Sequence, residues 1–363
     1  MRIAIDAREM TGRSTGVGRY LSEILRAWGH LAAAAAHDFI LCASEPLVVA
    51  ESSLRVSSLT QAGSGTMWEQ WTLPGLLARA NADVLFAPAY TAPLWCRVPT
   101  VLTIHDVSFA AHPEWFSWRE GLRRRTLARA SARRAARVIT ESDFSKREII
   151  RHLGVDPSAI DVIYLGTSSA PPAASHEPMV LYVGSLFNRR HVPVLIDGFT
   201  RVAARHPTLR LELVGDNRTF PAIDIDGAIA RSGAADRIRW RHYVPDADLA
   251  SLYARASAFV FLSEYEGFGL TPLEAIAAGV PPVVLDTEVA REIYGTAAEF
   301  VSRPEAGLVA AALERVLVDE AVRARLLAAG AAQIARYSWA ECAHRTLQVL
   351  LAVRPSVART VSR

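Results

Sequence analysis

Two glutamates flank a glycine-rich loop in the second half of the chain. Glu266 and Glu274 are separated by seven residues and enclose Gly267 and Gly269. Glycines lack the side chain that would hold an anion away from the backbone, so this loop favours close contact with a phosphate. The two carboxylates would repel a phosphate unless each has hydroxyl groups to bind. Together, these residue types predict a ligand that carries both phosphates and hydroxyls, as a sugar nucleotide does.

The elements around this loop would position it at the end of a buried sheet. The apolar runs 258–262 and 282–285 predict two buried parallel strands. Between them we predict a helix with Thr271 as its N-cap, whose first turn presents backbone N–H groups and a positive dipole end to an anion. The alternative interpretation is structural. In it, Glu274 forms a capping box with Thr271, and Glu266 is a solvated loop residue.

The same stretch resembles a family signature. EGFGL, followed by PLEA and AGVP, is similar to the signature of family 4 of the retaining glycosyltransferases, enzymes of the GT-B fold. In that family the first glutamate contacts the donor sugar, the second holds the ribose, and the amides between them meet the sugar and diphosphate. The resemblance covers nearly the whole chain and is most specific from 138 to 284. It implies a catalytic role for Glu266 and donor contacts by Gly267, Phe268, Gly269, Leu270 and Glu274.

Length and composition exclude several classes of protein. A chain of 363 residues suffices for two domains, each with its own core. No run of 18 apolar residues is free of charges or prolines, and the start MRIAIDAREM lacks the apolar region of a signal peptide, so we expect a cytoplasmic protein. A net charge of +3 does not indicate a general nucleic-acid binder. The three cysteines have no zinc spacing, and no histidine or cysteine joins the paired aspartates, so we predict no metal and no cofactor.

Strands alternate with helices along the chain, which predicts an α/β fold with parallel sheets. Apolar runs predict buried strands at 2–7, 39–43, 54–57, 83–87, 101–104, 138–140, 180–183, 209–215, 238–243, 258–262 and 282–285. The resemblance implies two Rossmann-like domains whose sheets face a central cleft. The predicted parts are an acceptor-binding domain at 1–165, a linker of small residues and prolines at 166–178, a nucleotide-sugar-binding domain at 179–338, a helix crossing back to the first domain at 339–353, and a loose tail at 354–363.

The first half offers two candidate sites. Gly16 and Gly18, in GVGRY, form a loop that in isolation predicts only a tight turn, whereas the matching loop of the family faces the donor diphosphate. His105 follows a predicted strand, at the edge of an open sheet where ligands bind. Spacing alone favours a buried histidine paired with Asp106. In related sequences a histidine at this point lies near the donor sugar, so the resemblance implies that His105 is a catalytic residue.

The sequence VGSLFNRRH resembles the first loop of the family's second domain, where an arginine and a lysine clasp the donor diphosphate. Arg190 matches the lysine, Ser185 replaces the arginine, and Arg189 is a candidate substitute for it. Two exposed loop arginines are the alternative interpretation. Tyr243 and Val244 match the family's base-binding loop weakly.

A basic stripe runs from Arg119 to Arg137. At about 100° per residue, one helix face collects the arginines at 119, 123, 129, 133, 134 and 137. A solvated face is the ordinary interpretation. Our hypothesis is that this face brings the protein to an anionic membrane surface, at the inner face of the cell membrane, and to a lipid-linked acceptor there.

Together these observations predict a retaining, metal-independent hexosyltransferase that moves a sugar from a nucleoside diphosphate to an acceptor hydroxyl on a lipid-linked or polysaccharide glycan. The GVGRY and HD features look most like mannosyltransferases of surface polysaccharide assembly, such as lipopolysaccharide synthesis, which suggests GDP-mannose as the donor. Two alternatives stay open: a sugar-nucleotide epimerase or hydrolase of the same fold, and a non-catalytic sugar-nucleotide-binding protein.

Overall fold

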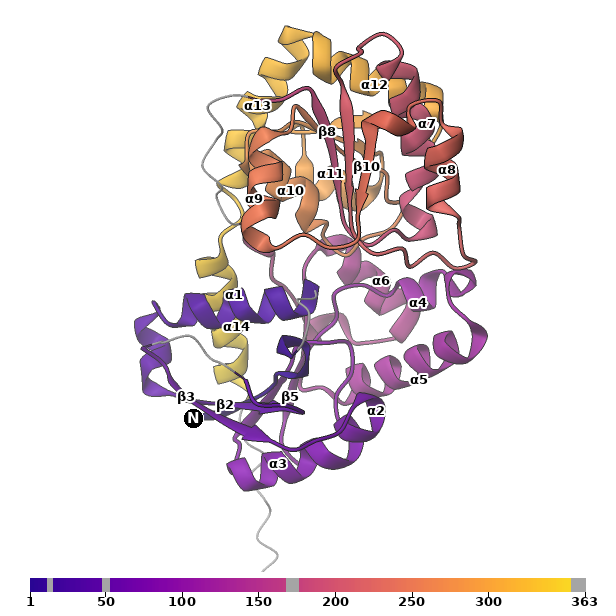
Figure 1. The fold of residues 1–363 in the computed structure, drawn as a ribbon. Coiled ribbons are helices and arrows are strands. Elements are labelled where there is room, and N and C mark those ends of the chain that lie inside the picture. Colours follow the sequence, from indigo (N-terminus) through magenta and orange to yellow (C-terminus); the bar gives the residue numbers. More distant parts are fainter. Residues whose placement is uncertain (12–15, 48–52, 168–175, 354–363) are drawn as a thin grey trace, which may run out of the picture. The chain divides into compact units, whose positions relative to one another are not determined.

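The computed structural model describes residues 1–11, 16–47, 53–167 and 176–353 (Figure 1). It divides into two compact units. Unit 1 comprises Met1–Gly166 together with the chain from Ser338 onward, and unit 2 comprises Thr167–Tyr337. Each unit is a parallel sheet with helices around it, so the predicted α/β fold with two Rossmann-like domains is confirmed.

Unit 1 contains a seven-stranded parallel sheet in the order β3-β2-β1-β4-β5-β6-β7. Its strands are β1 (Arg2–Asp6), β2 (Asp38–Ala43), β3 (Arg55–Thr60), β4 (Val84–Ala87), β5 (Thr100–Thr103), β6 (Arg137–Thr140) and β7 (Ile160–Val162). The strand order reverses between β1 and β4, where Ile3 pairs with Phe39 on one side and Val84 on the other. The carboxyl ends of the strands at such a reversal form the usual ligand-binding crevice of an open α/β sheet.

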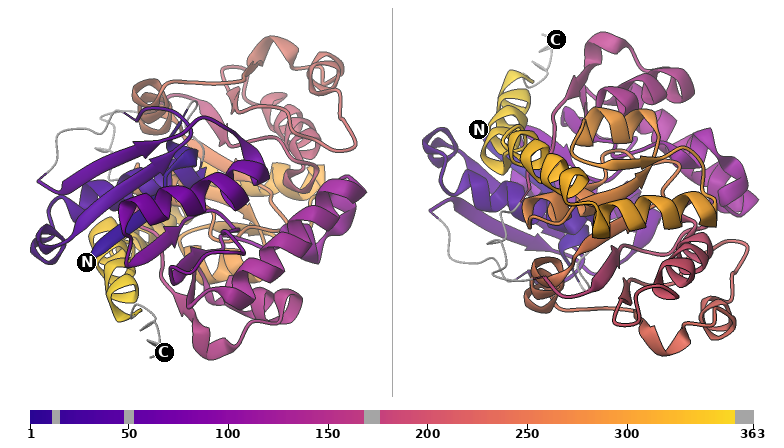
Figure 2. Two further views of the ribbon diagram at one scale, coloured as in Figure 1. Left: turned by 90° about the horizontal axis from the view of Figure 1, so that it is seen from below. Right: turned by 90° about the horizontal axis from the view of Figure 1, so that it is seen from above.

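The C-terminal helix belongs to unit 1. Trp28 of the first helix donates its indole N–H to the Ala343 carbonyl at 2.7 Å, so the first and last helices of the described chain pack together. Figure 2 shows this helix beside the first one. The helical segments of unit 1 are η1 (Arg8–Met10), α1 (Gly16–Trp28), η2 (Ala32–Ala36), α2 (Gly65–Met67), the π-helix η3 (Trp68–Thr72), α3 (Leu73–Ala80), α4 (Ser108–Ala111), η4 (Pro113–Trp115), α5 (Trp118–Arg134), α6 (Asp143–Leu153), η5 (Pro157–Ala159) and α14 (Trp339–Ala352).

Unit 2 contains a six-stranded parallel sheet in the order β10-β9-β8-β11-β12-β13, which reverses between β8 and β11. Its strands are β8 (Met179–Val183), β9 (Arg210–Val214), β10 (Ile238–Arg241), β11 (Ala258–Phe261), β12 (Pro282–Leu285) and β13 (Glu299–Val301). Its helical segments are η6 (Asn188–Arg190), α7 (Val192–Ala203), α8 (Ile225–Arg231), η7 (Ala235–Arg237), α9 (Asp246–Arg255), α10 (Leu270–Ala277), α11 (Glu288–Tyr294), α12 (Ala306–Val318) and α13 (Glu320–Ile334).

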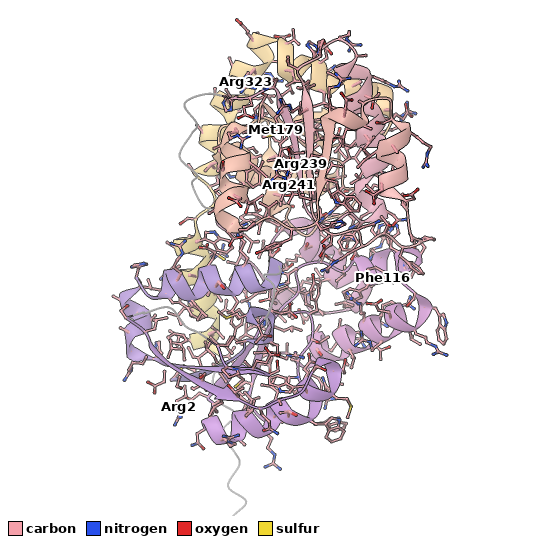
Figure 3. All side chains as sticks on the ribbon, viewed as in Figure 1. Arg2, Phe116, Met179, Arg239, Arg241 and Arg323 are labelled. Carbon is pink, nitrogen blue, oxygen red and sulfur yellow. The ribbon has the colours of Figure 1, made fainter. Side chains whose placement is uncertain are left out.

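The outer strand β10 of unit 2 is protected by charge. It carries Arg239 and Arg241, which Figure 3 labels on the strand. Arg241 pairs with Glu212 of the neighbouring strand at 3.1 Å. Charged side chains on an outer strand discourage pairing with other chains.

The basic stripe is shorter than the helical pattern predicts. Helix α5 ends at Arg134, and Arg137 instead opens strand β6, where it donates hydrogen bonds to Asp161 at 2.7 and 2.8 Å. The prediction that Arg137 belongs to the helix face is therefore wrong. The predicted linker falls largely on residues 168–175, and the predicted tail on 354–363, both outside the described residues.

Candidate active site

An arginine and a glutamate form an ion pair at the strand reversal of unit 2. Arg190 lies in η6, after β8, and Glu266 lies in the loop after β11. The Nε and Nη2 atoms of Arg190 are 2.9 and 2.8 Å from Oε1 of Glu266, and the two side chains are only 13% and 16% exposed. The side chain predicted to bind the diphosphate, Arg190, and the side chain predicted to contact the donor sugar, Glu266, are therefore in direct contact.

Neighbouring groups fix this pair. Ser263 donates its hydroxyl to Oε1 of Glu266 at 2.8 Å, and Nη1 of Arg190 donates to the Ser185 carbonyl at 2.8 Å. Gly184 has φ +142°, and a Cβ atom there would lie 2.7 Å from Nη1 of Arg190, so the guanidinium needs glycine at this position. Burial lowers the pKa of Arg190, but the charges and hydrogen bonds of Glu266 and Tyr182 together outweigh burial and raise it, so Arg190 is a permanent cation.

The other two residues of the predicted diphosphate clasp, Ser185 and Arg189, make hydrogen bonds that involve backbone carbonyl groups. Ser185 contributes its carbonyl oxygen to Arg190. Arg189 is buried, donates its Nε–H to the Tyr265 carbonyl at 3.2 Å, and stacks on the Phe187 ring at 4.4 Å. Arg189 thus braces the loop that carries Glu266, and Arg190 is the arginine whose charge meets the glutamate.

Helix α10 begins at Leu270, two residues earlier than a Thr271 cap predicts. Its N-cap is Gly269, with φ +88° and no side-chain capping bond, so the prediction of Thr271 as N-cap is wrong. A Cβ atom at Gly269 would lie 2.0 Å from the hydroxyl of Tyr294, which donates to the Gly269 carbonyl at 2.8 Å. Only glycine fits this entry to the helix. The stretch Gly267–Leu270 thus leads directly into the helix N-terminus, whose positive dipole end favours an anion.

Glu274 is not a capping residue, because the helix has no capping box. It lies in α10, is 7% exposed, and accepts a hydrogen bond from the hydroxyl of Tyr253 at 2.9 Å. The capping-box interpretation of this glutamate is therefore wrong. Tyr243 and Val244 follow strand β10; Tyr243 is 56% exposed and Val244 is buried.

His105 of unit 1 is held on both sides of its ring. Nδ1 bonds to the carboxylate of Glu141, and Nε2 lies 2.7 Å from the Pro88 carbonyl. Since both partners are acceptors, both ring nitrogens must carry protons. Burial lowers the pKa of His105, but Glu141, the Pro88 carbonyl and the charge of Asp106 together outweigh burial and raise it, with Glu141 contributing most. The sequence suggested Asp106 as the partner; Asp106 instead accepts the backbone N–H of Ser108 at 2.8 Å.

The two glycines of GVGRY lie in the first turn of α1. Gly16 begins the helix and Gly18 is buried within it. The residues 12–15, which precede them, are outside the described part of the chain. Tyr20, one turn further on, reaches Thr103 at the end of β5 with its hydroxyl at 3.3 Å and packs edge-on against the ring of His105.

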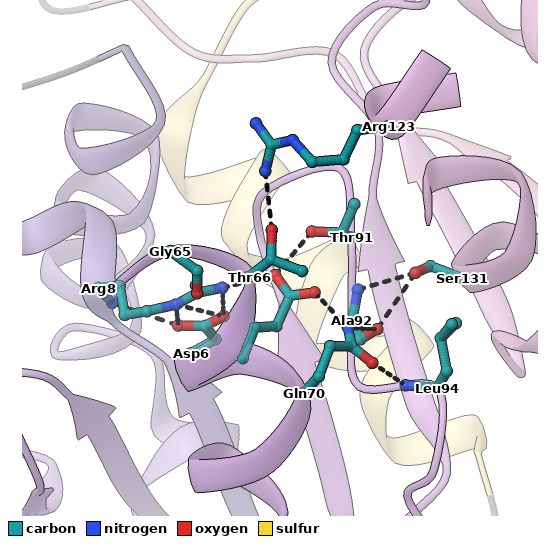
Figure 4. Close-up of polar contacts among 11 residues, drawn as sticks. Asp6, Arg8, Gly65, Thr66, Gln70, Thr91, Ala92, Leu94, Arg123 and Ser131 are labelled. Atoms are coloured by element: carbon teal, nitrogen blue, oxygen red, sulfur yellow. Dashed lines mark hydrogen bonds and ion pairs between the residues drawn. The ribbon is translucent and has the colours of Figure 1, made fainter. Parts of the chain in front are cut away.

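Sequence reasoning missed a second buried charge network in unit 1 (Figure 4). Nη2 of Arg8 lies 2.6 Å from Asp6 and 2.7 Å from Glu69, and Thr91 donates its hydroxyl to Glu69 at 2.7 Å. Asp6 ends β1 and Thr91 follows β4, so the network ties together the strand ends at the reversal of this sheet. Glu69 lies in the π-helix, an element that is frequent at functional sites. The sequence signal that could have revealed this network is Glu69, an acidic residue inside an otherwise apolar helical pattern.

Two family models match successive parts of the chain. The family model described as Glycosyltransferase Family 4 matches residues 14–170, and the model described as Glycosyl transferases group 1 matches residues 168–333. O-antigen chain mannosyltransferase B of Escherichia coli is 29% identical over 262 residues, which cover 68% of each chain. O-antigen chain mannosyltransferase RfbU of Salmonella typhimurium is 28% identical over 229 residues, covering 62% of this chain and 63% of the relative.

Solved structures share the fold across nearly the whole chain. HepE of Anabaena, solved in complex with UDP and glucose, matches with a TM-score of 0.73 at 20% identity and covers 97% of this chain and 99% of its own. WaaG, a glycosyltransferase involved in lipopolysaccharide biosynthesis, matches with a TM-score of 0.75 at 14% identity and covers 97% of this chain and 100% of its own. At these identities, the likeness establishes the two-domain fold alone.

Proposed function

The chain belongs to the family 4 glycosyltransferases of the GT-B fold, and we propose that it moves a mannosyl group from GDP-mannose to a hydroxyl of an acceptor glycan, with retention at the anomeric carbon. The mannosyltransferase relatives support mannose, and their O-antigen names support an acceptor in surface polysaccharide assembly. HepE was solved with UDP and glucose, so a uridine nucleotide is the donor that an experiment must separate from GDP.

The observation that carries this proposal is the Arg190–Glu266 pair beside the start of α10. In the transfer, the bond from the anomeric carbon to the diphosphate breaks and a bond to the acceptor oxygen forms. Arg190 and the backbone amides at Gly267–Leu270 stabilise the negative charge on the departing diphosphate. Glu266 stabilises the positive charge on the sugar ring. The leaving phosphate accepts the proton of the acceptor hydroxyl, so the step needs no protein nucleophile or base. Because Arg190 and the amides neutralise the diphosphate, we propose that the step also needs no divalent ion.

Two further residues have proposed roles in donor recognition. Glu274 binds the ribose hydroxyls, and Tyr243, exposed beyond β10, offers a ring on which the base stacks. His105 stays a proposed site residue of unit 1. Because both of its ring nitrogens are occupied, it would act as a fixed positive charge.

Thermal unfolding with a panel of nucleotides tests the donor assignment first. We expect GDP to raise the melting temperature more than UDP or ADP at equal concentration, because the nucleotide with the lowest Kd stabilises the folded state most. A ligand at 100 times its Kd contributes about 2.7 kcal/mol. Incubation with GDP-mannose and extracted lipid acceptor then tests the reaction, with and without a chelator. Selective stabilisation by UDP would overturn the choice of GDP. Loss of activity with the chelator would overturn the metal-independent mechanism. Epimerised or hydrolysed donor without transfer would favour the alternative enzyme classes.

We also propose that unit 1 binds an anionic membrane, through the two ends of α5 rather than its whole basic face. Arg129 and Arg133 donate hydrogen bonds to the carbonyls of His152 and Leu153, so these two arginines are engaged with the last carbonyl groups of α6. The ends of α5 carry two aromatic–cation pairs: Arg119 over Trp118 and Arg134 over Trp95, each 5.3 Å from the ring centre. Trp118 and Trp95 are 72% and 76% exposed. Exposed tryptophan beside arginine is the combination that favours a membrane interface. Within the described residues, no helix is long and apolar enough to cross a bilayer.

Vesicle sedimentation checks the membrane proposal. The variant with Trp95→Ala and Trp118→Ala should bind vesicles of anionic phosphatidylglycerol about tenfold more weakly than the parent protein, because two apolar side chains are lost from the interface. Phe220→Ala removes an exposed aromatic ring of unit 2 and serves as the matched control, with binding unchanged. Equal binding by the double variant and the parent, or no binding by the parent at low salt, would contradict the proposal.

A further inference from the structure

Glu274 shares a buried hydrogen bond with a tyrosine from another helix. Tyr253 lies near the end of α9 and is 4% exposed, and its hydroxyl lies 2.9 Å from Oε2 of Glu274. The same hydroxyl is 3.3 Å from the carbonyl of Thr271, in the first turn of α10. The phenol is thus anchored to the helix that carries the glutamate as well as to the carboxylate itself.

The tyrosine ring fixes where this hydroxyl can be. The ring stacks on Phe259 of β11, with ring centres 5.8 Å apart and an angle of 27° between the planes. β11 also leads into the loop of Glu266, so the position of the phenol is set by the strand at the centre of the candidate site. A glutamate side chain has three freely rotating bonds, and a hydrogen bond from a rigid donor selects one of its conformations.

We propose that Tyr253 is a positioning residue for nucleotide recognition, which holds the carboxylate of Glu274 in the orientation that accepts the neighbouring hydroxyls of the ribose. The inference rests on the proposed function, because the ribose contact of Glu274 is part of it. A carboxylate receives two adjacent hydroxyls only when its plane faces both. A site built to hydrogen-bond a hydroxyl also rejects the analogue that lacks it, because a buried polar group is then left unpaired. Tyr253 therefore contributes to discrimination between ribose and deoxyribose nucleotides.

Tyr253→Phe tests this role, because it removes one oxygen and keeps the stacked ring. We expect the KM for GDP-mannose to rise about tenfold with kcat within about twofold, because the lost bond orients a ground-state contact. We also expect the ratio of the Kd values of 2′-deoxy-GDP and GDP, measured by calorimetry, to fall towards one. A purely structural tyrosine would leave that ratio unchanged.

Two further variants separate the possible outcomes. Tyr337→Phe deletes a buried phenol oxygen that donates to the Ile293 carbonyl at 2.8 Å in the same unit, so it should lower the melting temperature without changing the Kd ratio. Glu274→Gln should remove the discrimination directly. If Glu274→Gln loses it and Tyr253→Phe keeps it, the role of Tyr253 is overturned and the proposed function stands. If the parent protein does not discriminate between the two nucleotides, the ribose contact and the role of Tyr253 fall together.

Discussion

Replacing Glu266 with glutamine is expected to lower kcat by about 10²–10³-fold while leaving the donor KM unchanged or lower. Glutamine keeps the size of the side chain and a carbonyl oxygen that can accept the hydrogen bonds of Ser263 and Arg190. It removes the negative charge that offsets the positive charge developing on the sugar ring. The substitution also frees Arg190 from its counterion, which favours binding of the donor diphosphate. Initial rates over a range of donor concentrations separate the two parameters.

The matched control lies two residues earlier in the same loop. Glu264 has a 43% exposed side chain that faces His191 at 2.9 Å, and Glu264→Gln should keep kcat within about threefold. Arg190→Ala should instead raise KM and lower kcat, because its charge binds the diphosphate both before and during bond cleavage. Transfer at the parent rate by the Glu266→Gln protein would rule out the assigned role of this carboxylate.

The central motif could be predicted because its elements are adjacent in sequence. A buried strand, a glycine loop and a helix start follow one another between residues 258 and 277, so local rules place Glu266 near the helix N-terminus. The partners that orient the glutamates are harder to find. Arg190 and Tyr253 come from other elements, and only the closing of the sheet brings them to the loop. The resemblance supplied Arg190, whereas nothing in the sequence pointed to Tyr253.

Most of the strands were predictable from apolar runs, and the two that were missed share a physical reason. β7 and β13 each have three residues, lie at the outer edges of their sheets, and are only partly buried. Short edge strands bury one face at most, so their apolar pattern is weak. The start of α10 was misplaced because a threonine followed by proline is a strong capping signal, and the contact of Gly269 with Tyr294 outweighs it.

The partner of His105 also shows the limit of sequence spacing. Asp106 is the nearest acidic residue in the chain, but successive residues at the end of a strand point in different directions. Glu141 follows β6, the strand next to β5, and its carboxylate meets the ring across the sheet. Strand order therefore decides the pairing, and that order is known only once the sheet is assembled.

The His105–Glu141 pair carries the second large expected effect, which concerns the stability of unit 1. Below pH 6.5, Glu141→Gln should lower the free energy of unfolding by about 3–5 kcal/mol, because there it leaves a buried imidazolium without its counterion. Glu141 is 4% exposed, and the ring is enclosed by Tyr20 and Tyr90, so water cannot replace the lost carboxylate. Urea unfolding followed by tryptophan fluorescence measures this effect. The signal reports mainly unit 1, because Trp240 is the only one of the 8 tryptophans in unit 2.

The pH dependence gives the same pair a sharper test. The pKa of His105 is raised above its ordinary value of 6.5, because Glu141, with smaller contributions from the Pro88 carbonyl and Asp106, outweighs the effect of burial. The folded state therefore binds this proton more tightly than the unfolded chain does. The stabilisation is complete below pH 6.5 and is lost as the pH rises through the raised pKa of the folded state. In the Glu141→Gln variant burial dominates and lowers the pKa of His105, so the slope reverses and stability rises with pH in the range near and below 6.5.

A surface histidine provides the control for this reversal. His112 stacks on Trp115 and lies 3.1 Å from Glu114, with a 37% exposed side chain, so Glu114→Gln should leave the pH profile of unfolding close to that of the parent. Parallel profiles for the parent and Glu141→Gln proteins would contradict the ion pair. A reversed slope confined to Glu141→Gln would instead establish that His105 is a buried cation at the carboxyl edge of the sheet. That charge is the one proposed for His105 in unit 1.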